Sequence, residues 1–135
     1  TFLTLQALTA DLVVMRTPFS GACHQAAGWV DIPVINAGDG THEHPTQGLL
    51  DALTILQFKG GFRDLVVSIV GDIRHSRVAR SAAQVLGTLG VGELRLIAPD
   101  ELMPDAAEFP GALRFGSIDE GIDHADVVMI LRIQN

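Results

Sequence analysis

The sequence has a single cysteine, few basic residues and no long apolar run. Cys23 cannot form an internal disulfide, which is compatible with a reducing cytoplasm, and we expect its role to be structural. No stretch approaches the length of a membrane span, and no charged-then-apolar secretory leader is present. The net charge of −7 argues against nucleic acid as a partner. We therefore expect a cytoplasmic protein that binds neither membrane nor nucleic acid.

Apolar residues make up 47% of the chain and fall into alternating strand-like and helix-like segments. This alternation predicts βαβ units, and so an α/β fold in which helices flank parallel sheets. Strands are expected at 12–16, 32–36, 65–70, 94–97, 113–115 and 127–131. Helices are expected at 2–8, 21–28, 45–58, 77–89 and after a capping box at 117–120.

The segment 33–47, PVINAGDGTHEHPTQ, contains the strongest functional signal. We expect residues 36–40 to end the strand, because glycine allows positive φ and close backbone approach. Pro45 suits the first position of a helix. The leucines of that helix share one face: Leu49, Leu50, Leu53 and Leu56. His44, Thr46 and Gln47 would thus lie between a strand end and a helix N-terminus, where open α/β sheets bind anionic ligands.

Basic residues fall at or just past the expected strand ends, although the chain is acidic overall. They are Arg16, Arg74, Arg77, Arg80 and Arg132. A locally basic cleft focuses small anions, but the same arginines could simply be solvated residues at helix starts. His44 could likewise be an ordinary helix N-cap, and Asp72 could cap the next helix. The segment 42–44 could hint at a metal, but no further ligand cluster is visible, so we expect no metal site.

Four stretches together resemble the aspartate carbamoyltransferase family. They are VMRTP at 14–18, INAGDGTHEHPTQ at 35–47, VGDIRHSRVARS at 70–81 and MILRIQ at 129–134. The resemblance runs through essentially the whole chain, but members of that family are more than twice as long. The chain starts inside an apparent helix and stops directly after a strand. We therefore expect it to be part of a longer protein.

This resemblance implies parts of two Rossmann-like domains. Residues 1–60 resemble the rear half of a carbamoyl phosphate-binding domain together with the linking helix. Residues 61–135 resemble the front part of an aspartate-binding domain. The family transfers the carbamoyl group of carbamoyl phosphate to the amine of L-aspartate, a step of pyrimidine biosynthesis that needs no metal or redox cofactor.

By the same resemblance, six residues would form the site. His44 would donate a hydrogen bond to the carbamoyl oxygen, and Gln47 would bind the carbamoyl amino group. Arg16 would contact the phosphate and the carbonyl oxygen. Arg77 and Arg132 would hold the carboxylates of aspartate, because a guanidinium grips a carboxylate with two hydrogen bonds, with Gln134 beside them.

The chain lacks three parts of the family pattern: a Ser-Thr-Arg-Thr phosphate-binding loop, a mobile loop whose Ser and Lys enter the neighbouring subunit's site, and a Pro-Leu loop expected downstream of Gln134. We therefore expect the 135-residue segment alone to be inactive. The family forms homotrimers with shared sites, to which regulatory or dihydroorotase chains can attach. The alternatives are an ornithine carbamoyltransferase or an inactive homologue that acts as a structural partner. A nucleotide-binding Rossmann domain is disfavoured, since no G-x-G-x-x-G follows any strand.

Overall fold

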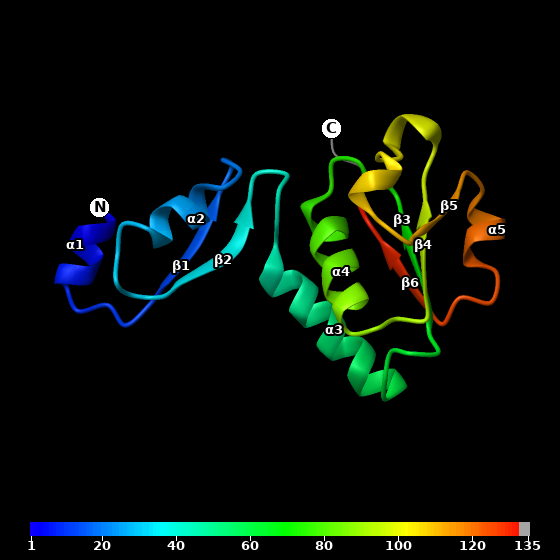
Figure 1. The fold of residues 1–135 in the computed structure, drawn as a ribbon, viewed down its shortest axis with the longest axis horizontal. Coiled ribbons are helices and arrows are strands. Elements are labelled where there is room, and N and C mark those ends of the chain that lie inside the picture. The colour runs from blue at the N-terminus through cyan, green and yellow to red at the C-terminus, as the bar shows by residue number, and fades with distance from the viewer. Residues whose placement is uncertain (133–135) are drawn as a thin grey trace.

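In the computed structural model, which describes residues 1–132, one long helix joins two parallel β-sheets (Figure 1). The first sheet has two strands, and the second has four strands in the order β5-β4-β3-β6. Every strand pair in both sheets is parallel. The predicted fold class, parallel sheets with flanking helices, is confirmed.

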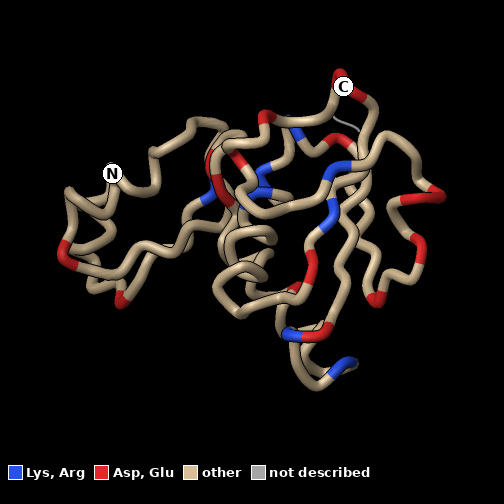
Figure 2. The backbone as a smooth tube through the Cα atoms, turned by 45° about the vertical axis from the view of Figure 1, so that its right-hand side comes forward, with Lys and Arg blue, Asp and Glu red and all other residues tan. Residues whose placement is uncertain are grey.

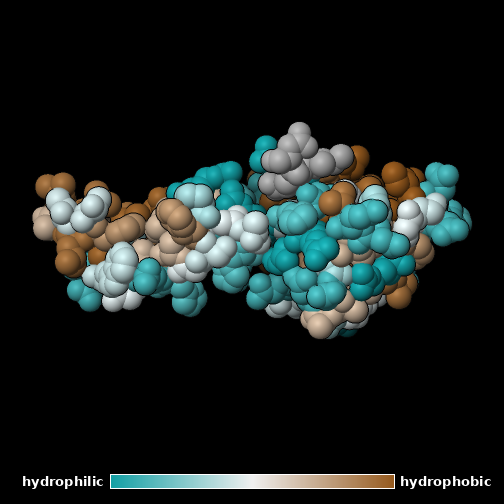
Figure 3. Space-filling view, turned by 90° about the horizontal axis from the view of Figure 1, so that it is seen from above, coloured by the Kyte–Doolittle hydropathy of each residue, from teal (hydrophilic) through white to brown (hydrophobic). Residues whose placement is uncertain are grey.

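The N-terminal unit, residues 1–44, carries the two-stranded sheet. Its elements are α1 (Phe2–Ala7), β1 (Val13–Thr17), α2 (Ala22–Ala27) and β2 (Val34–Asp39). Helix α2 packs against both strands and buries Cys23 and Ala26 there. Many other apolar side chains of this unit are exposed, and Figure 3 shows them as brown patches on its surface at the left.

Strand β2 continues three residues further than the sequence predicts. We expected residues 36–40 to break the strand, but Thr17 still pairs with Asp39, and Gly40 N–H donates to the Thr17 carbonyl at 2.9 Å. The register shifts between Met15 and Thr17, and Gly38 adopts a φ of 118°. Because glycine tolerates this angle, the pair absorbs the irregularity and remains a strand.

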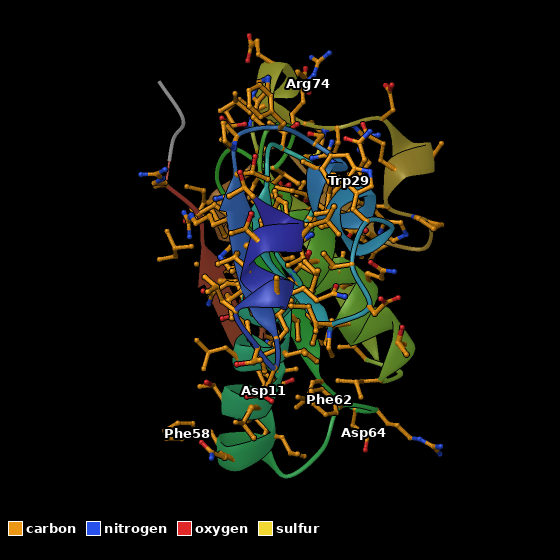
Figure 4. All side chains as sticks on the ribbon, turned by 90° about the vertical axis from the view of Figure 1, so that its left-hand side faces the viewer. Asp11, Trp29, Phe58, Phe62, Asp64 and Arg74 are labelled. Atoms are coloured by element: carbon orange, nitrogen blue, oxygen red, sulfur yellow. The ribbon has the colours of Figure 1, made fainter. Side chains whose placement is uncertain are left out.

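The C-terminal unit, residues 61–132, carries the four-stranded sheet, and α3 (Pro45–Lys59) connects it to the N-terminal unit. Its elements are β3 (Val66–Val70), α4 (Arg77–Thr88), β4 (Glu93–Ile97), the 3₁₀ turns η1 (Asp100–Leu102) and η2 (Ala106–Glu108), β5 (Leu113–Phe115), α5 (Ile118–Ile122) and β6 (Val127–Ile130). Helix α3 ends as expected at Gly60, whose φ is 76°. Figure 4 shows Phe58 and Phe62 near this turn, at the lower end of the molecule. Within residues 1–132, no helix is both long and apolar enough to cross a membrane.

Strand β3 forms the centre of the C-terminal core. Successive side chains of a strand point to opposite faces, so Val67 and Ile69 lie on one side and Ser68 on the other. Val67 packs with Leu86 of α4, whereas the Ser68 hydroxyl donates to the Gly121 carbonyl of α5 at 2.8 Å. Both faces of the sheet are therefore covered, α4 lying on one and α5 on the other.

Helix α3 packs through small residues rather than through its leucines. Leu49, Leu50, Leu53 and Leu56 are 45–60% exposed. The buried positions are Gly48, Ala52 and Ile55. A Cβ at Gly48 would lie 3.0 Å from the Ser81 carbonyl oxygen, so a larger residue would push α3 and α4 apart by a few tenths of an ångström. The helix face that carries the four leucines is therefore not the face that packs on α4.

The prediction of a capping box at the start of α5 is wrong. Ser117 precedes the helix, but its side chain accepts no capping hydrogen bond. A capping box forms at η2 instead, where Asp105 and Glu108 exchange side-chain and backbone hydrogen bonds. Asp72 does not cap α4 either, since Ser76 does so by accepting from Ala79 N–H at 3.1 Å.

Candidate active site

A cavity of about 840 Å³ opens where the two units meet, and it is lined from four places in the chain. These are the end of β1 with the residues after it, the β2–α3 loop with the start of α3, the β3–α4 loop with the start of α4, and the residues after β6. Because the strands of each sheet are parallel, their carboxyl ends and the loops that follow share one edge, and these edges border the cavity. Figure 2 shows blue arginine positions in this region, where the two units meet.

Five of the six residues predicted from the sequence line this cavity: Arg16, His44, Gln47, Arg77 and Arg132. The sixth, Gln134, lies outside the described residues. Arg77 is half-buried, whereas Arg16 and Arg132 are exposed. Within residues 1–132, no ion pair forms on any of these three arginines. The cavity is therefore lined by three guanidinium groups that form no ion pair with any described residue, and although the charge of Asp39 acts on Arg77, the excess of positive charge suits an anionic ligand.

His44 is fixed at the start of α3 by two contacts. Its backbone N–H donates to the Ser81 hydroxyl at 2.8 Å, and its Nδ1 lies 3.2 Å from the Thr46 hydroxyl. Burial lowers the pKa of His44, and the charges of Arg77 and Arg16 lower it further. A neutral ring that accepts the Thr46 hydroxyl proton at Nδ1 carries its own proton on Nε2. Such a ring offers the cavity one N–H donor.

Arg77 lies against the glycine turn that ends β2. Its Nη1 donates to the Gly40 carbonyl at 3.1 Å, and a Cβ at Gly38 would lie 2.7 Å from its Cζ. Burial and the nearby charges of Arg16 and Arg132 lower the pKa of Arg77. The glycines thus leave room for a guanidinium from the other unit, and this contact joins the two units at the cavity.

A buried carboxylate, that of Asp39, organises the same turn. Burial by itself would raise its pKa, but hydrogen bonds from the Gly21 and Glu43 N–H groups at 2.8 and 3.0 Å help to hold the pKa below its usual value. His42 Nδ1 lies 3.3 Å from the same carboxylate, so its ring faces Asp39 rather than the cavity. The His42 ring therefore contacts the buried carboxylate of Asp39, whereas His44 lines the cavity. Within residues 1–132, no group of three His, Cys, Asp or Glu side chains could hold a metal ion.

Sequence reasoning missed several residues of this region. His75 lines the cavity and points its Nδ1 at the buried Asp72, 2.9 Å away. Ser81 supports the His44 backbone from α4, a contact between residues 37 positions apart. Both lie within the stretch 70–81 that carries the family resemblance, so their position in that motif was the only available signal.

Replacement of Ser81 by alanine is expected to lower the free energy of unfolding by about 1–3 kcal/mol, since the His44 N–H would lose its partner. Chemical denaturation measures this value. Thr54→Val is the matched control, because the Thr54 hydroxyl donates to Leu50 on an exposed part of α3 and its loss should change stability by less than about 0.5 kcal/mol. Equal losses for both variants would contradict a specific role for Ser81.

Comparison with known proteins identifies the relatives of this chain. Residues 1–57 match the family described as "Aspartate/ornithine carbamoyltransferase, carbamoyl-P binding domain". The whole chain is 58% identical over 135 residues to the aspartate carbamoyltransferase catalytic subunit of Rhizorhabdus wittichii and covers 42% of it. The chain is similar to aspartate carbamoyltransferase catalytic subunits over its whole length. The corresponding subunit of Thermobifida fusca is 54% identical over 135 residues, with 99% of this chain and 42% of the relative covered.

Solved carbamoyltransferase structures share the fold. Aspartate transcarbamoylase from Trypanosoma cruzi in complex with carbamoyl aspartate and phosphate has a TM-score of 0.88 at 30% identity, covering 100% of this chain and 47% of that chain. The same enzyme in complex with carbamoyl phosphate and aspartate has a TM-score of 0.86 at 29% identity, covering 98% and 49%. The chain therefore spans less than half the length of these relatives.

Proposed function

We propose that the gene product carrying this sequence transfers the carbamoyl group of carbamoyl phosphate to L-aspartate, giving N-carbamoyl-L-aspartate and phosphate. The observation that carries the proposal is the convergence of Arg16, His44, Gln47, Arg77 and Arg132 on one cavity. Relatives more than 50% identical are named aspartate carbamoyltransferase catalytic subunits. The solved relative from Trypanosoma cruzi is described in complex with carbamoyl phosphate and aspartate.

The proposed residues match the charges that develop in the reaction. The aspartate amine attacks the carbamoyl carbon, negative charge builds on its oxygen, the C–O bond to phosphate breaks and the amine gives up a proton. His44 donates to the developing oxyanion, and Arg16 contacts that oxygen and the phosphate. Gln47 accepts from the carbamoyl NH₂, where a carboxylate would repel the phosphate.

The two units would divide the substrates between them. We propose that residues 1–60 belong to the carbamoyl phosphate-binding domain and that residues 61–135 belong to the aspartate-binding domain. Arg16, His44 and Gln47 come from the first part, whereas Arg77 and Arg132 come from the second. Two guanidinium groups suit the two carboxylates of aspartate, whereas ornithine has one carboxylate and a second ammonium group that they would repel.

The proposal includes a homotrimer, because the family that the sequence resembles forms homotrimers with active sites shared between adjacent chains. The proposal is tested by assaying the complete gene product for carbamoyl aspartate formation and phosphate release, with aspartate and ornithine as rival acceptors. Turnover with aspartate supports it. Turnover with ornithine alone, or with neither acceptor, would favour one of the two alternatives.

The segment 1–135 by itself is expected to be inactive, because its sequence does not contain the phosphate-binding loop or the Ser and Lys loop of the family pattern. The segment also exposes apolar side chains on its last strand, where Ile130 is 83% and Val128 43% exposed, which favours aggregation. The test is to express the segment beside the complete gene product and compare rates of carbamoyl aspartate formation. Activity of the segment within about tenfold of the complete protein would contradict the expectation.

A further inference from the structure

The amide of Gln47 is held on one side by Asp51, one turn further along α3. Gln47 Nε2 donates to Asp51 Oδ1 at 2.9 Å, and the contact is partly buried. Residues four apart lie on the same helix face, so this geometry follows from the helix itself. A carboxylate only accepts hydrogen bonds, so the amide nitrogen of Gln47 must face it. The amide oxygen is then the end that remains for another partner.

Asp51 does not line the cavity itself but acts on two residues that do. Gln47 and His44 line the cavity, whereas Asp51 does not. Its negative charge raises the pKa of His44, against burial and the two arginines that lower it. One carboxylate outside the cavity therefore acts on the two polar side chains at the start of α3, by a hydrogen bond to one and by its charge on the other.

We propose that Asp51 is a positioning residue that turns the Gln47 amide oxygen toward the cavity and so makes the site selective for an acyl phosphate bearing an N–H donor. The inference rests on the proposed function and concerns the same cavity. With the amide fixed in this way, the carbamoyl NH₂ finds an acceptor. An acyl phosphate with a methyl group in that place leaves the amide oxygen without a partner.

Selectivity of this kind arises because an unmade hydrogen bond is costly. A site built to bond a substrate N–H rejects an analogue that lacks it, since the buried polar group is left unpaired. Acetyl phosphate is the matched probe, because it keeps the carbonyl and the phosphate of carbamoyl phosphate and replaces NH₂ by CH₃. The ratio of the two affinities therefore reports the orientation of the Gln47 amide.

The test compares the complete gene product with its Asp51→Ala and Asp51→Asn variants. Calorimetry gives the Kd values of carbamoyl phosphate and acetyl phosphate, and steady-state kinetics gives KM and kcat. For Asp51→Ala we expect the Kd and KM of carbamoyl phosphate to rise about tenfold, with kcat and the Kd of acetyl phosphate within about threefold of wild type. For Asp51→Asn, the Kd and KM of carbamoyl phosphate should lie between those of wild type and Asp51→Ala. An asparagine amide either accepts or donates a hydrogen bond, so it permits both orientations of the Gln47 amide. Gln57→Ala, at an exposed position of α3, is the control and should match wild type.

A double-mutant cycle separates positioning from a general effect on folding. In a Gln47→Ala background, Asp51→Ala should change the Kd ratio of the two acyl phosphates by less than about twofold, since the side chain through which it acts is gone. A similar drop in selectivity in both backgrounds would overturn the inference, as would wild-type selectivity in Asp51→Ala. If Asp51→Ala fails to fold, the near-isosteric Asp51→Asn carries the test. A wild-type protein that binds carbamoyl phosphate but forms no carbamoyl aspartate contradicts the proposed function alone, whereas equal affinity for both acyl phosphates contradicts the inference.

Discussion

Replacement of His44 by alanine is expected to lower kcat by about 10²–10³-fold and to raise the KM for aspartate much less. The ring lies at the start of α3 and lines the cavity, and burial and two arginines lower its pKa. A neutral ring with its proton on Nε2 supplies a hydrogen bond to an oxygen that becomes negative only during the reaction. Its loss therefore affects the transition state more than the bound substrates.

The neighbouring histidine provides the control for this prediction. His42 is two residues away, but its ring contacts Asp39 and Glu43 and does not line the cavity. His42→Ala should keep kcat within a few-fold of wild type, because Asp39 retains the hydrogen bonds from Gly21 and Glu43. Steady-state kinetics of both variants in the complete gene product makes the comparison. A His44→Ala enzyme with near-normal kcat would remove His44 from the proposed mechanism.

The sequence predicted the convergence of the site better than it predicted the contacts that support it. Short apolar runs followed by arginines and glycines placed Arg16, His44 and Arg77 near strand ends, but the resemblance to the family, not the spacing, predicted that they share one site. Which residues form hydrogen bonds with these site residues depends on tertiary packing. Ser81 meets His44 across the close contact between α3 and α4, where Gly48 leaves room for the Ser81 backbone.

What local patterns left open or predicted wrongly has the same origin. Four leucines at helical spacing indicate an apolar face, but periodicity does not say which face packs on the next helix, and in α3 it is the face with Gly48 and Ala52. A serine followed three residues later by glutamate indicates a capping box, yet the bond depends on the local backbone and forms at Asp105 rather than at Ser117. Local patterns in the sequence identified the helices and strands. Contacts between residues far apart in the sequence, and the local backbone, determine which helix face packs and where a capping box forms.

The position of Arg77 against the N-terminal unit predicts an effect on the pKa of His44. Arg77 is half-buried, and its guanidinium donates to the Gly40 carbonyl at 3.1 Å. Arg77→Gln removes a positive charge beside His44, so the pKa of His44 should rise toward its ordinary value. An NMR titration of the imidazole measures this shift without any need for turnover, and an unchanged His44 pKa would contradict the proximity of the two side chains.

Replacing Arg77 or Arg132 by glutamine is expected to weaken aspartate binding by about 2–5 kcal/mol while carbamoyl phosphate binding changes much less. Both side chains line the cavity from the C-terminal unit, and Arg77 should give the larger loss because it is half-buried whereas Arg132 is exposed. Arg74→Gln is the matched control, since this exposed arginine lies in the loop just before α4 but outside the cavity. Figure 4 shows Arg74 at the upper end of the molecule. Titration of the complete gene product with each substrate measures the effects. Equal losses for both substrates would show that these arginines do not distinguish aspartate from carbamoyl phosphate, and the division of substrates between the two units would then be wrong.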